Sequence, residues 1–312
     1  MIVFACAHPS IDKLFEVERL TPGAIHRPSS FVQVAGGKGL NAARAAVSIG
    51  ADVRAVALVG GHAGGWIEDS LAREGVDARS ARGSHETRSC LSVADEETGG
   101  LTEFYEDGPP VEGSVWGAFE SEIEEALVDA AWIALSGSIP SGAPEDGYAA
   151  IVASARKSGV RVAVDARGVY LEHALSSEPD VVKVNGSEAA QILGSRATND
   201  DPVVVAHDLR GRAGGDGHAA VVTLGTDGVI GVDPGGRVLR GTLDVRGRYP
   251  VGSGDAFLGG LLAAFDEGDH PFEKALASAL GAAAANAEVP GAGRLNVERA
   301  RALSARARVE TI

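Results

Sequence analysis

The sequence predicts an α/β fold in which helices cover a mostly parallel sheet. Two observations carry this prediction. Short apolar runs of strand length alternate with helical patterns along most of the 312 residues. Polar and glycine-rich segments follow several of these runs, at the end of the sheet where such folds bind ligands. The length allows a large core, so we expect one domain over residues 1–312 with an insertion.

The first part of the chain begins with a βα alternation. Residues 1–7 are apolar and have no basic segment before them, which indicates a buried strand rather than a targeting segment. Helical and strand patterns follow in turn, separated by glycine and proline. We expect strands at residues 14–20, 31–34, 53–59 and 76–80, a loop at 21–28, and helices at 39–49 and 66–73.

A hairpin then interrupts the alternation. Residues 89–94 and 101–105 have strand patterns and are joined by an acidic turn that contains glycine. Together with the early strands, this hairpin could form a small separate sheet that is either a lid over a site or a contact surface for a second subunit. The alternative is a simple edge meander of the main sheet. The lid segments would be residues 12–35 and 86–110, approximately.

The second half of the chain returns to the doubly wound pattern. Its last strand patterns are closely spaced, and alanine-rich helices close the chain. We expect strands at residues 131–135, 161–165, 181–184, 221–224, 229–232 and 238–241, helices at 115–129 and 145–157, and helices that begin near Ala256, Phe272 and Asn296.

The composition excludes several classes of function. The net charge of −15 disfavours nucleic acid and anionic membranes as partners. No apolar run approaches membrane-spanning length. Cys6 and Cys90 are the only cysteines, too few for a disulfide framework or a thiolate metal site, so a reducing cytoplasm is the expected setting. No histidines are spaced as a metal-ligand pair, and no Ser/His/Asp order indicates acyl transfer.

The segment around Asp255 is typical of phosphoryl transfer. Gly252 and Gly254 can adopt backbone angles that point successive N–H groups into one concavity, and the helix that follows adds its positive dipole end. Together with Ser253 they would form an anion site, while Asp255 accepts a proton from an attacking hydroxyl. A plain helix N-cap explains the same residues.

The other glycine-rich turn, at residues 36–41, lacks the spacing of a P-loop. Gly36 and Gly37 let a ligand approach the backbone, and Asn41 offers donors and acceptors to a polyol. A glycine turn that starts a helix is the alternative. Lys38 in this turn and Arg88, at the start of the hairpin, would make a phosphate site if they converge.

Polar residues after other strands are further candidates. Asp12 can accept hydrogen bonds from two sugar hydroxyls, although a solvated turn aspartate is the simpler explanation of this residue taken by itself. Ser138 lies in a hydroxyl- and glycine-rich segment that fits a polar ligand or an ordinary turn. Asn185 and Glu188 could hold water on Mg²⁺, with Lys183 at nucleotide phosphates, or they form a helix capping box. Residues 223–228 leave room for a nucleotide or make a tight hairpin.

Six segments in one order resemble the PfkB, or ribokinase-like, carbohydrate kinases, and the resemblance spans nearly the whole chain. These segments are GGKGLNAARAA at 36–46, TRSC at 87–90, SGSIPSG at 136–142, KVNGSE at 183–188, TLGTDG at 223–228 and VGSGDAF at 251–257. The resemblance implies a three-layer α/β/α sandwich with a small β lid that often builds a dimer interface, and Mg²⁺-ATP as phosphoryl donor.

The resemblance also implies roles for individual residues. Asp255 is the expected catalytic base, with Gly252, Ser253 and Gly254 as the anion hole. Sugar and sugar-phosphate contacts are expected from Asp12, Gly36, Gly37, Lys38, Asn41, Arg88 and Ser138. Nucleotide contacts are expected from Lys183, Asn185, Glu188, Thr223, Gly225, Thr226, Gly228 and Asn286, with Asn185 and Glu188 organising Mg²⁺ through water.

Within the family, the chain is most similar to the branch of 1-phosphofructokinase, tagatose-6-phosphate kinase and the minor 6-phosphofructokinase. A ketohexose phosphate is therefore the expected acceptor, with fructose 1-phosphate first. The alternatives are a kinase of a free sugar or nucleoside, and a ligand-binding regulator without turnover. Tyr249-Pro250 replaces the usual Asp-Thr before the last turn, His8 replaces the commoner Asn before Pro9, and Val184 stands where proline is common.

Overall fold

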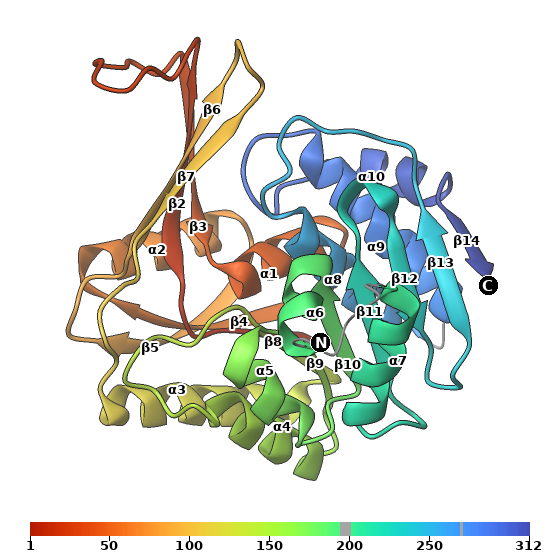
Figure 1. Ribbon diagram of the computed structural model, residues 1–312. Helices are drawn as coiled ribbons and strands as arrows, with labels where there is room; N and C mark the ends of the chain where they lie inside the picture. The colour runs from red at the N-terminus through yellow and green to blue at the C-terminus, as the bar shows by residue number, and fades with distance from the viewer. Residues whose placement is uncertain (194–200, 269–270) are drawn as a thin grey trace.

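The computed structural model describes residues 1–193, 201–268 and 271–312. In this part of the chain, ten strands form one central sheet (Figure 1). From one edge to the other, the order is β14 (Arg308–Thr311), β13 (Val238–Thr242), β12 (Val229–Val232), β11 (Ala219–Thr223), β10 (Val181–Asn185), β9 (Arg161–Asp165), β8 (Trp132–Ser136), β1 (Ile2–Cys6), β4 (Val53–Gly60) and β5 (Asp77–Gly83).

The strands from β11 through β10, β9, β8, β1 and β4 to β5 are parallel, and β12, β13 and β14 extend the sheet as antiparallel neighbours. The central strands are rich in valine and alanine and are buried on both faces, as expected for a parallel sheet covered by helices. The carboxyl ends of these parallel strands share one edge of the sheet. Ser136 pairs with Asp165, and Asn185 pairs with Thr223, so their polar ends are brought side by side.

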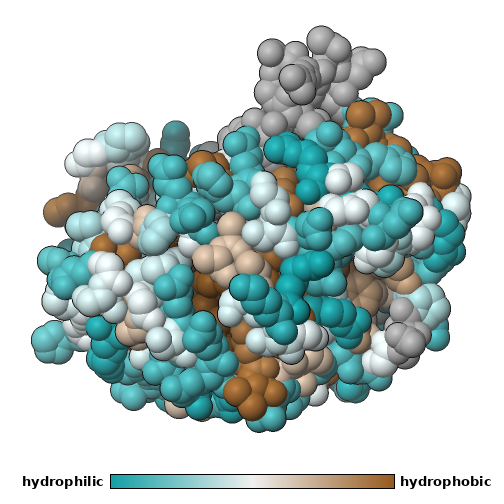
Figure 2. Space-filling view, turned by 90° about the horizontal axis from the view of Figure 1, so that it is seen from below, coloured by the Kyte–Doolittle hydropathy of each residue, from teal (hydrophilic) through white to brown (hydrophobic). Residues whose placement is uncertain are grey.

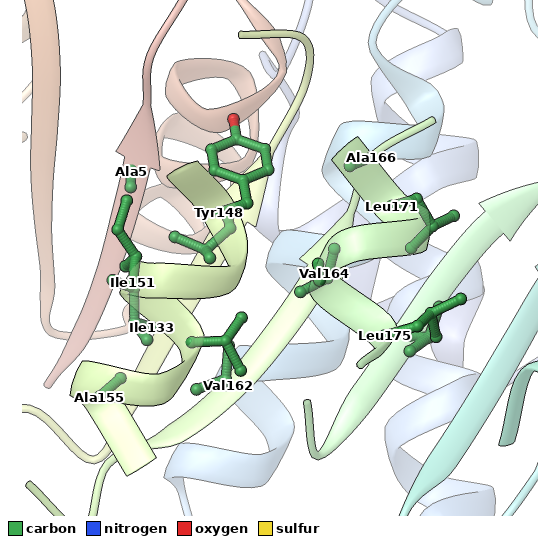
Figure 3. Close-up of a cluster of buried hydrophobic side chains, with 14 of the residues drawn as sticks. Ala5, Ile133, Tyr148, Ile151, Ala155, Val162, Val164, Ala166, Leu171 and Leu175 are labelled. Atoms are coloured by element: carbon green, nitrogen blue, oxygen red, sulfur yellow. The ribbon is translucent and has the colours of Figure 1, made fainter. Parts of the chain in front are cut away.

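Helices cover both faces of the sheet and make a three-layer structure. One core lies against α3 (Gly113–Ala126), α4 (Gly147–Lys157), α5 (Gly168–Leu175) and α7 (Pro202–Arg212). Figure 3 shows part of this core, in which Tyr148 and Ile151 of α4 pack over Ile133 and Val162 of the sheet. The other core lies against α1 (Lys38–Ser48), α2 (Gly61–Arg73), α8 (Ser253–Asp266) and α9 (Phe272–Ala287), and α10 (Val297–Ser304) packs on α9.

A second sheet stands apart from the main one and rises beside it in Figure 1. Its order is β3 (Ser30–Gly36), β2 (Ser10–Val17), β6 (Ser89–Asp95) and β7 (Leu101–Tyr105). The predicted hairpin is therefore part of a separate small sheet, and an edge meander of the main sheet is excluded. β6 and β7 lie within the expected lid segment 86–110, whereas β2 begins two residues before the expected segment 12–35 and β3 ends one residue after it.

Several boundaries differ from the sequence prediction. β2 occupies Ser10–Val17 rather than residues 14–20, and α2 begins at Gly61 rather than at residue 66 because its glycines and histidine conceal a first turn. The sequence does not predict α5, α7 or β14. α7 carries both Asp201 as N-cap and Pro202 at its first position, but its valine run has the composition of a strand.

Figure 2 shows one face of the molecule, on which hydrophilic residues predominate and apolar residues are scattered. This agrees with the acidic composition. Among the described residues, none of the helices has both the length and the apolar character that crossing a membrane requires.

Candidate active site

The glycine turn before α8 places Asp255 in the first turn of a helix. Gly252 has φ 82°, a left-handed conformation that disfavours side chains, and the helix begins at the next residue. A methyl group on Gly252 would also lie 2.6 Å from the Cβ of Ala292. The Ser253 N–H donates to the Pro250 carbonyl at 3.1 Å, but the N–H groups of Gly254 and Asp255 have no acceptor in their own helix. The buried Ser253 Oγ has no partner among the described residues. The turn therefore has the donors that an anion site needs.

The Asp255 carboxyl is 7% exposed, and burial raises its pKa to about 6 although the Lys38 ammonium acts in the opposite direction. Asn41 Nδ2 donates a hydrogen bond to Asp255 Oδ2 at 2.9 Å. Because α1 begins directly after Gly37, its first turn brings Asn41 against α8. A carboxylate with a pKa close to neutral is suited to take a proton from a hydroxyl and release it afterwards.

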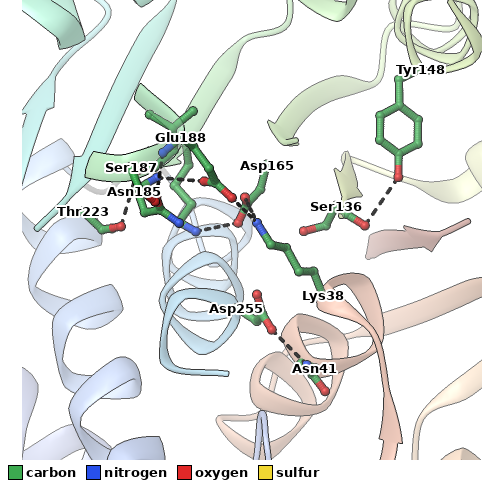
Figure 4. A network of polar contacts seen from close by, with 12 residues as sticks. Lys38, Asn41, Ser136, Tyr148, Asp165, Asn185, Ser187, Glu188, Thr223 and Asp255 are labelled. Carbon is green, nitrogen blue, oxygen red and sulfur yellow. Dashed lines mark hydrogen bonds and ion pairs between the residues drawn. The ribbon is translucent and has the colours of Figure 1, made fainter. Parts of the chain in front are cut away.

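Next to Asp255 lies a cluster of alternating charges, shown in Figure 4. The Lys38 ammonium donates to Asp165 Oδ1 at 3.0 Å and to Glu188 Oε1 at 2.8 Å. The Lys183 ammonium donates to Asp165 Oδ2 at 2.5 Å. Burial alone would raise the pKa of Asp165, but the two lysines hold it below its usual range. The cluster thus brings two cations to the end of the sheet beside the glycine turn.

Lys183 faces the glycine turn directly. A methyl group on Gly254 would lie 3.3 Å from the Lys183 Nζ, so glycine leaves this ammonium open toward the start of α8. Burial alone would lower the pKa of Lys38, but Asp165 and Glu188 raise it, and Lys38 stays charged. A negatively charged group at the glycine turn would meet these cations and the α8 amides together.

Asn185 and Glu188 form the capping box that the sequence leaves as an alternative. The Glu188 N–H donates to Asn185 Oδ1, and the Asn185 N–H donates to Glu188 Oε2, both at 2.9 Å. Glu188 also meets Lys38 through its other oxygen, so the capping box and a position in the polar cluster are compatible. α6 (Gly186–Leu193) therefore starts with a carboxylate fixed in direction.

The predicted nucleotide turn lies beside this box. Thr223 pairs with Asn185 across two parallel strands, and its hydroxyl donates to the Val184 carbonyl at 3.3 Å. Gly225 and Gly228 have φ of 62° and 97°, and a methyl group on Gly228 would lie 2.1 Å from the Gly241 carbonyl oxygen. Thr226, between them, is exposed. The structure thus brings these residues together, and their contact with a nucleotide stays a prediction.

At the other end of the site, Asp12 is held by Ser10, whose hydroxyl donates to Asp12 Oδ1 at 2.5 Å. Burial raises the pKa of Asp12, with Ser10 acting in the opposite direction. A methyl group on Gly36 would lie 2.0 Å from the Asp12 carboxyl carbon, and one on Gly37, where φ is 102°, would lie 2.8 Å from the Cys6 Sγ. The backbone angle therefore favours glycine at position 37, and a side chain at position 36 would displace the Asp12 carboxylate.

Arg88 uses its guanidinium on backbone carbonyls. It donates to His8 and Glu106 at 3.0 Å and to Pro9 at 3.4 Å. In the described part of the chain, Lys38 and Arg88 share no hydrogen-bond or ion-pair partner, so their convergence on one phosphate stays a prediction. Ser138 Oγ lies 3.0 Å from His8 Nδ1, and burial lowers the pKa of His8 to about 4.

A cavity of about 300 Å³ lies between the lid sheet and the segments that precede α8 and follow α9. Its lining includes Asp12 and Tyr105 from the lid, and Tyr249, Val251 and Ala292 from the opposite side. Tyr249 joins the two sides, because its hydroxyl donates to Glu16 Oε1 of β2 at 2.7 Å. The volume is at the lower limit for small-molecule sites.

Asn286 is 0% exposed in α9. Its Nδ2 donates to the carbonyls of Gly291 and Arg294, which fixes the loop that packs on Gly252. Its Oδ1 has no partner among the described residues. The structure therefore places Asn286 behind the loop, and its predicted role at a nucleotide stays a prediction.

Among residues 1–193, 201–268 and 271–312, the structure has no group of three or more His, Cys, Asp or Glu side chains that could hold a metal ion. Asp165 and Glu188 do offer oxygens at the sheet end, but each already meets an ammonium. Such a donor set fits Mg²⁺ held mainly by phosphate oxygens and water, which is how this ion usually binds.

The sequence analysis did not identify Asp165 as a site residue. Its signal was present, since it is a carboxylate directly after the apolar run of β9, as Asn185 is after β10. The Tyr249–Glu16 hydrogen bond joins residues 233 positions apart, and no local pattern indicates it. Asp255, Asn41 and Lys38, which the sequence analysis assigns to one site, lie close together, and their roles there stay predictions.

Comparisons with known proteins agree with this geometry. A family model described as pfkB family carbohydrate kinase matches residues 7–299. A tagatose-6-phosphate kinase of Staphylococcus epidermidis is 30% identical over 263 residues, 84% of this chain and 84% of that protein. Phosphofructokinase-2 from Escherichia coli, solved with potassium, has a TM-score of 0.88 at 24% identity and covers 98% of each chain. A possible 1-phosphofructokinase from Thermotoga maritima has a TM-score of 0.87 at 24% identity, over 100% of this chain and 99% of that one.

The family match and the related tagatose-6-phosphate kinase show that the protein is a phosphotransferase with an alcohol group as acceptor. The carboxylate at a helix start, the glycine turn and the flanking cations are what such a transfer requires. The chain belongs to the pfkB family of carbohydrate kinases. The ribokinase-like three-layer fold that the sequence predicts is confirmed.

Proposed function

We propose that the protein transfers the γ-phosphoryl group of Mg²⁺-ATP to a primary hydroxyl of a ketohexose phosphate, with fructose 1-phosphate first and fructose 6-phosphate or tagatose 6-phosphate next. The observation that carries the reaction class is the Asp255 carboxylate, buried with a pKa of about 6 at the glycine turn of α8. The names of the relatives support a phosphorylated acceptor. Two buried cysteines without a disulfide fit the cytoplasm as its setting.

In this mechanism the acceptor hydroxyl attacks the γ-phosphorus in line with the leaving ADP oxygen. Asp255 takes the hydroxyl proton as the new O–P bond forms and the bond to ADP breaks. The N–H groups of the α8 turn and the Lys183 ammonium neutralise charge on the migrating group. Asp12 and Asn41 hold sugar hydroxyls at the acceptor end.

Mg²⁺ would supply charge neutralisation on the phosphates when bound. Glu188 and Asn185 would hold its water ligands, since the capping box fixes both side chains at the sheet end. The Lys38 ammonium lies 2.8 Å from Glu188, where it would contact the phosphates of ATP. A methyl group on Gly225 would meet no atom within 4 Å, so this turn leaves space for the nucleotide beside Thr223 and Gly228.

The role of Arg88 distinguishes the two hypotheses for the acceptor, a phosphorylated sugar and a free sugar. Its donors meet backbone carbonyls of His8, Pro9 and Glu106, an arrangement that also suits a structural arginine beside a free-sugar site. A panel of ketohexose phosphates, free sugars and nucleosides with ATP, followed by ADP release, separates these functions. We expect turnover with a ketohexose phosphate and a loss of that preference in Arg88→Ala.

The matched control is Arg79→Ala, which removes a surface ion pair with Glu125 and should leave the preference unchanged. Preference for a free sugar or nucleoside in the parent protein would contradict the proposed acceptor. Nucleotide binding without any product over the whole panel would instead favour a regulator without turnover.

We also propose that the protein forms a homodimer through the lid sheet. Strand register places Phe15, Phe31, Leu91 and Phe104 on the lid face that points away from the cavity. Phe31 and Phe104 are 60% and 57% exposed, which is unusual for an apolar sheet face in a monomer. Sedimentation should give a dimer for the parent protein and a monomer for Phe31→Asp/Phe104→Asp, whereas a monomeric parent at micromolar concentration would contradict this proposal.

A further inference from the structure

Arg44 is a buried cation behind the site, and its position is not explained by the chemistry above. It lies three residues after Asn41 on α1, and its side chain is 3% exposed. Arginine is rarely buried unless each donor is satisfied. Here Nε donates to Glu74 Oε2 at 2.6 Å, and Nη2 donates to the Ala35 carbonyl at 2.5 Å.

The remaining contacts of Arg44 point toward the reacting groups. Its Nη1 donates to Asn41 Oδ1 at 3.2 Å, and the same Asn41 amide donates from Nδ2 to Asp255 Oδ2 at 2.9 Å. A guanidinium can only donate hydrogen bonds, so it fixes which end of the amide is oxygen. Hydrogen bonds therefore run from Arg44 through Asn41 to Asp255, while Glu74 accepts from Arg44 on the other side.

Arg44 also holds the loop behind the glycine turn. Its Nη1 donates to the Ala292 carbonyl at 2.9 Å. Ala292 and Gly293 lie so close to Gly252 that a methyl group there would be 2.6 Å from the Ala292 Cβ and 2.9 Å from the Gly293 nitrogen. One guanidinium thus fixes both the amide at the catalytic carboxylate and the support of the anion turn.

We propose that Arg44 is a positioning residue of the active site, which acts through the Asn41 amide to orient the Asp255 carboxylate. With Oδ2 occupied by Asn41, Oδ1 of Asp255 accepts no hydrogen bond from the described residues and is left for the acceptor hydroxyl. This inference rests on the proposed function, since it assigns Asp255 as the base.

The test is Arg44→Lys, which keeps the charge but cannot bridge Asn41, Glu74 and two carbonyls at once. We expect kcat/KM to fall about 10- to 100-fold, as for a lost hydrogen bond to a charged group. The acidic limb of kcat/KM should move to higher pH, because a weaker hydrogen bond from Asn41 stabilises the ionised Asp255 less. A merely structural role would leave that limb in place.

A double-mutant cycle shows whether Arg44 acts through Asn41. In the Asn41→Ala background, Arg44→Lys should lower kcat/KM by less than about twofold, because the hydrogen bond from Arg44 to the Asn41 side chain is already removed. Arg294→Gln is the matched control, since Arg294 also meets Glu74, at 3.3 Å, but makes no hydrogen bond to the Asn41 side chain in the described part of the chain. That variant should keep the parent pH profile.

The proposal is overturned if Arg44→Lys keeps the kcat/KM and the acidic limb of the parent. It is also overturned if the fold-loss of kcat/KM in the double variant equals the product of the fold-losses in Arg44→Lys and Asn41→Ala. Should Arg44→Lys fail to fold, Glu74→Ala loosens the guanidinium without removing it, and an unchanged acidic limb would overturn the proposal equally. If the parent enzyme turns over no acceptor, the proposed function fails first. Titration of Asp255 by NMR, without substrate, then still shows whether Arg44→Lys raises its pKa.

Discussion

The ammonium of Lys38 lies 2.8 Å from the carboxylate of Glu188, although 150 positions separate them in the chain. This contact joins the glycine-rich turn predicted to bind the sugar to the capping box predicted to serve the nucleotide. Asp165 lies at the same ammonium and connects it to Lys183. One cluster of charges therefore joins the two halves of the predicted site.

Lys38→Met should make the enzyme less efficient with ATP, because it removes a cation proposed to contact the ATP phosphates. Without its ammonium, Asp165 and Glu188 add negative charge where the phosphates enter. We expect kcat/KM for ATP to fall about 10- to 100-fold, the loss typical of a charge-assisted hydrogen bond. Steady-state kinetics with ATP varied measures this, with Lys157→Met on the surface of α4 as control. An unchanged kcat/KM for ATP would refute the role of Lys38.

Asp165→Asn should destabilise the fold, because it leaves the Lys183 ammonium, 3% exposed, without a counter-charge. We expect the free energy of unfolding to fall by about 3–5 kcal/mol, measured by urea denaturation at neutral pH. Since the pKa of Asp165 is below its usual range, its stabilisation persists above the unfolded value and is lost only as pH falls through the folded one. Equal stability of the two proteins at neutral pH would contradict this.

The dependence of kcat/KM on pH should report the ionisation of the catalytic base. Burial raises the pKa of Asp255 to about 6, and only the ionised carboxylate can accept the proton. Activity should therefore fall as pH decreases through about 6 and should be constant above it until another group titrates. A profile that stays level to about pH 4.5 would mean that an unperturbed acid, or none, acts as base.

Tyr249→Phe tests the link between the lid and the turn before α8. It removes only the hydroxyl that donates to Glu16 at 2.7 Å, on the lid side of the cavity. We expect the KM of the acceptor to rise about 3- to 10-fold with kcat nearly unchanged, because the closed lid is less favoured. Tyr170→Phe on α5 is the control. A fall in kcat at constant KM would place Tyr249 in the chemistry instead.

The parts of the site that the sequence predicts are short segments whose residues interact with their neighbours in the chain. Gly252 turns the backbone at φ 82° and Asp255 follows in the first turn of α8, so this short segment positions the carboxylate by itself, although Gly254 lies within the helix and does not take a left-handed angle as well. The capping box at Asn185 and Glu188 is equally local. Most strands are also predicted within a few residues, since their apolar runs are buried on both faces. The main misses, α5, α7 and β14, are short or have a composition that conflicts with their structure.

Long-range packing explains what the sequence does not predict. Whether Lys38 would meet Arg88 or Glu188 depends on how α1 packs beside α6 and the lid, which no spacing of residues encodes. The Asn41–Asp255 hydrogen bond likewise requires α1 to pack on α8, across 214 positions. Arg44 is an ordinary helix residue by sequence, and only its burial among Asn41, Glu74 and Ala292 gives it a role.

The most direct test of the central claim is the turnover rate of Asp255→Asn with ATP and the best acceptor of the parent enzyme. The amide keeps the size of the side chain but cannot take a proton, so kcat should fall about 10²- to 10⁴-fold while the protein stays folded and binds ATP. A kcat within about twofold of the parent value would contradict the assignment of Asp255 as the base, and with it the mechanism proposed for this enzyme.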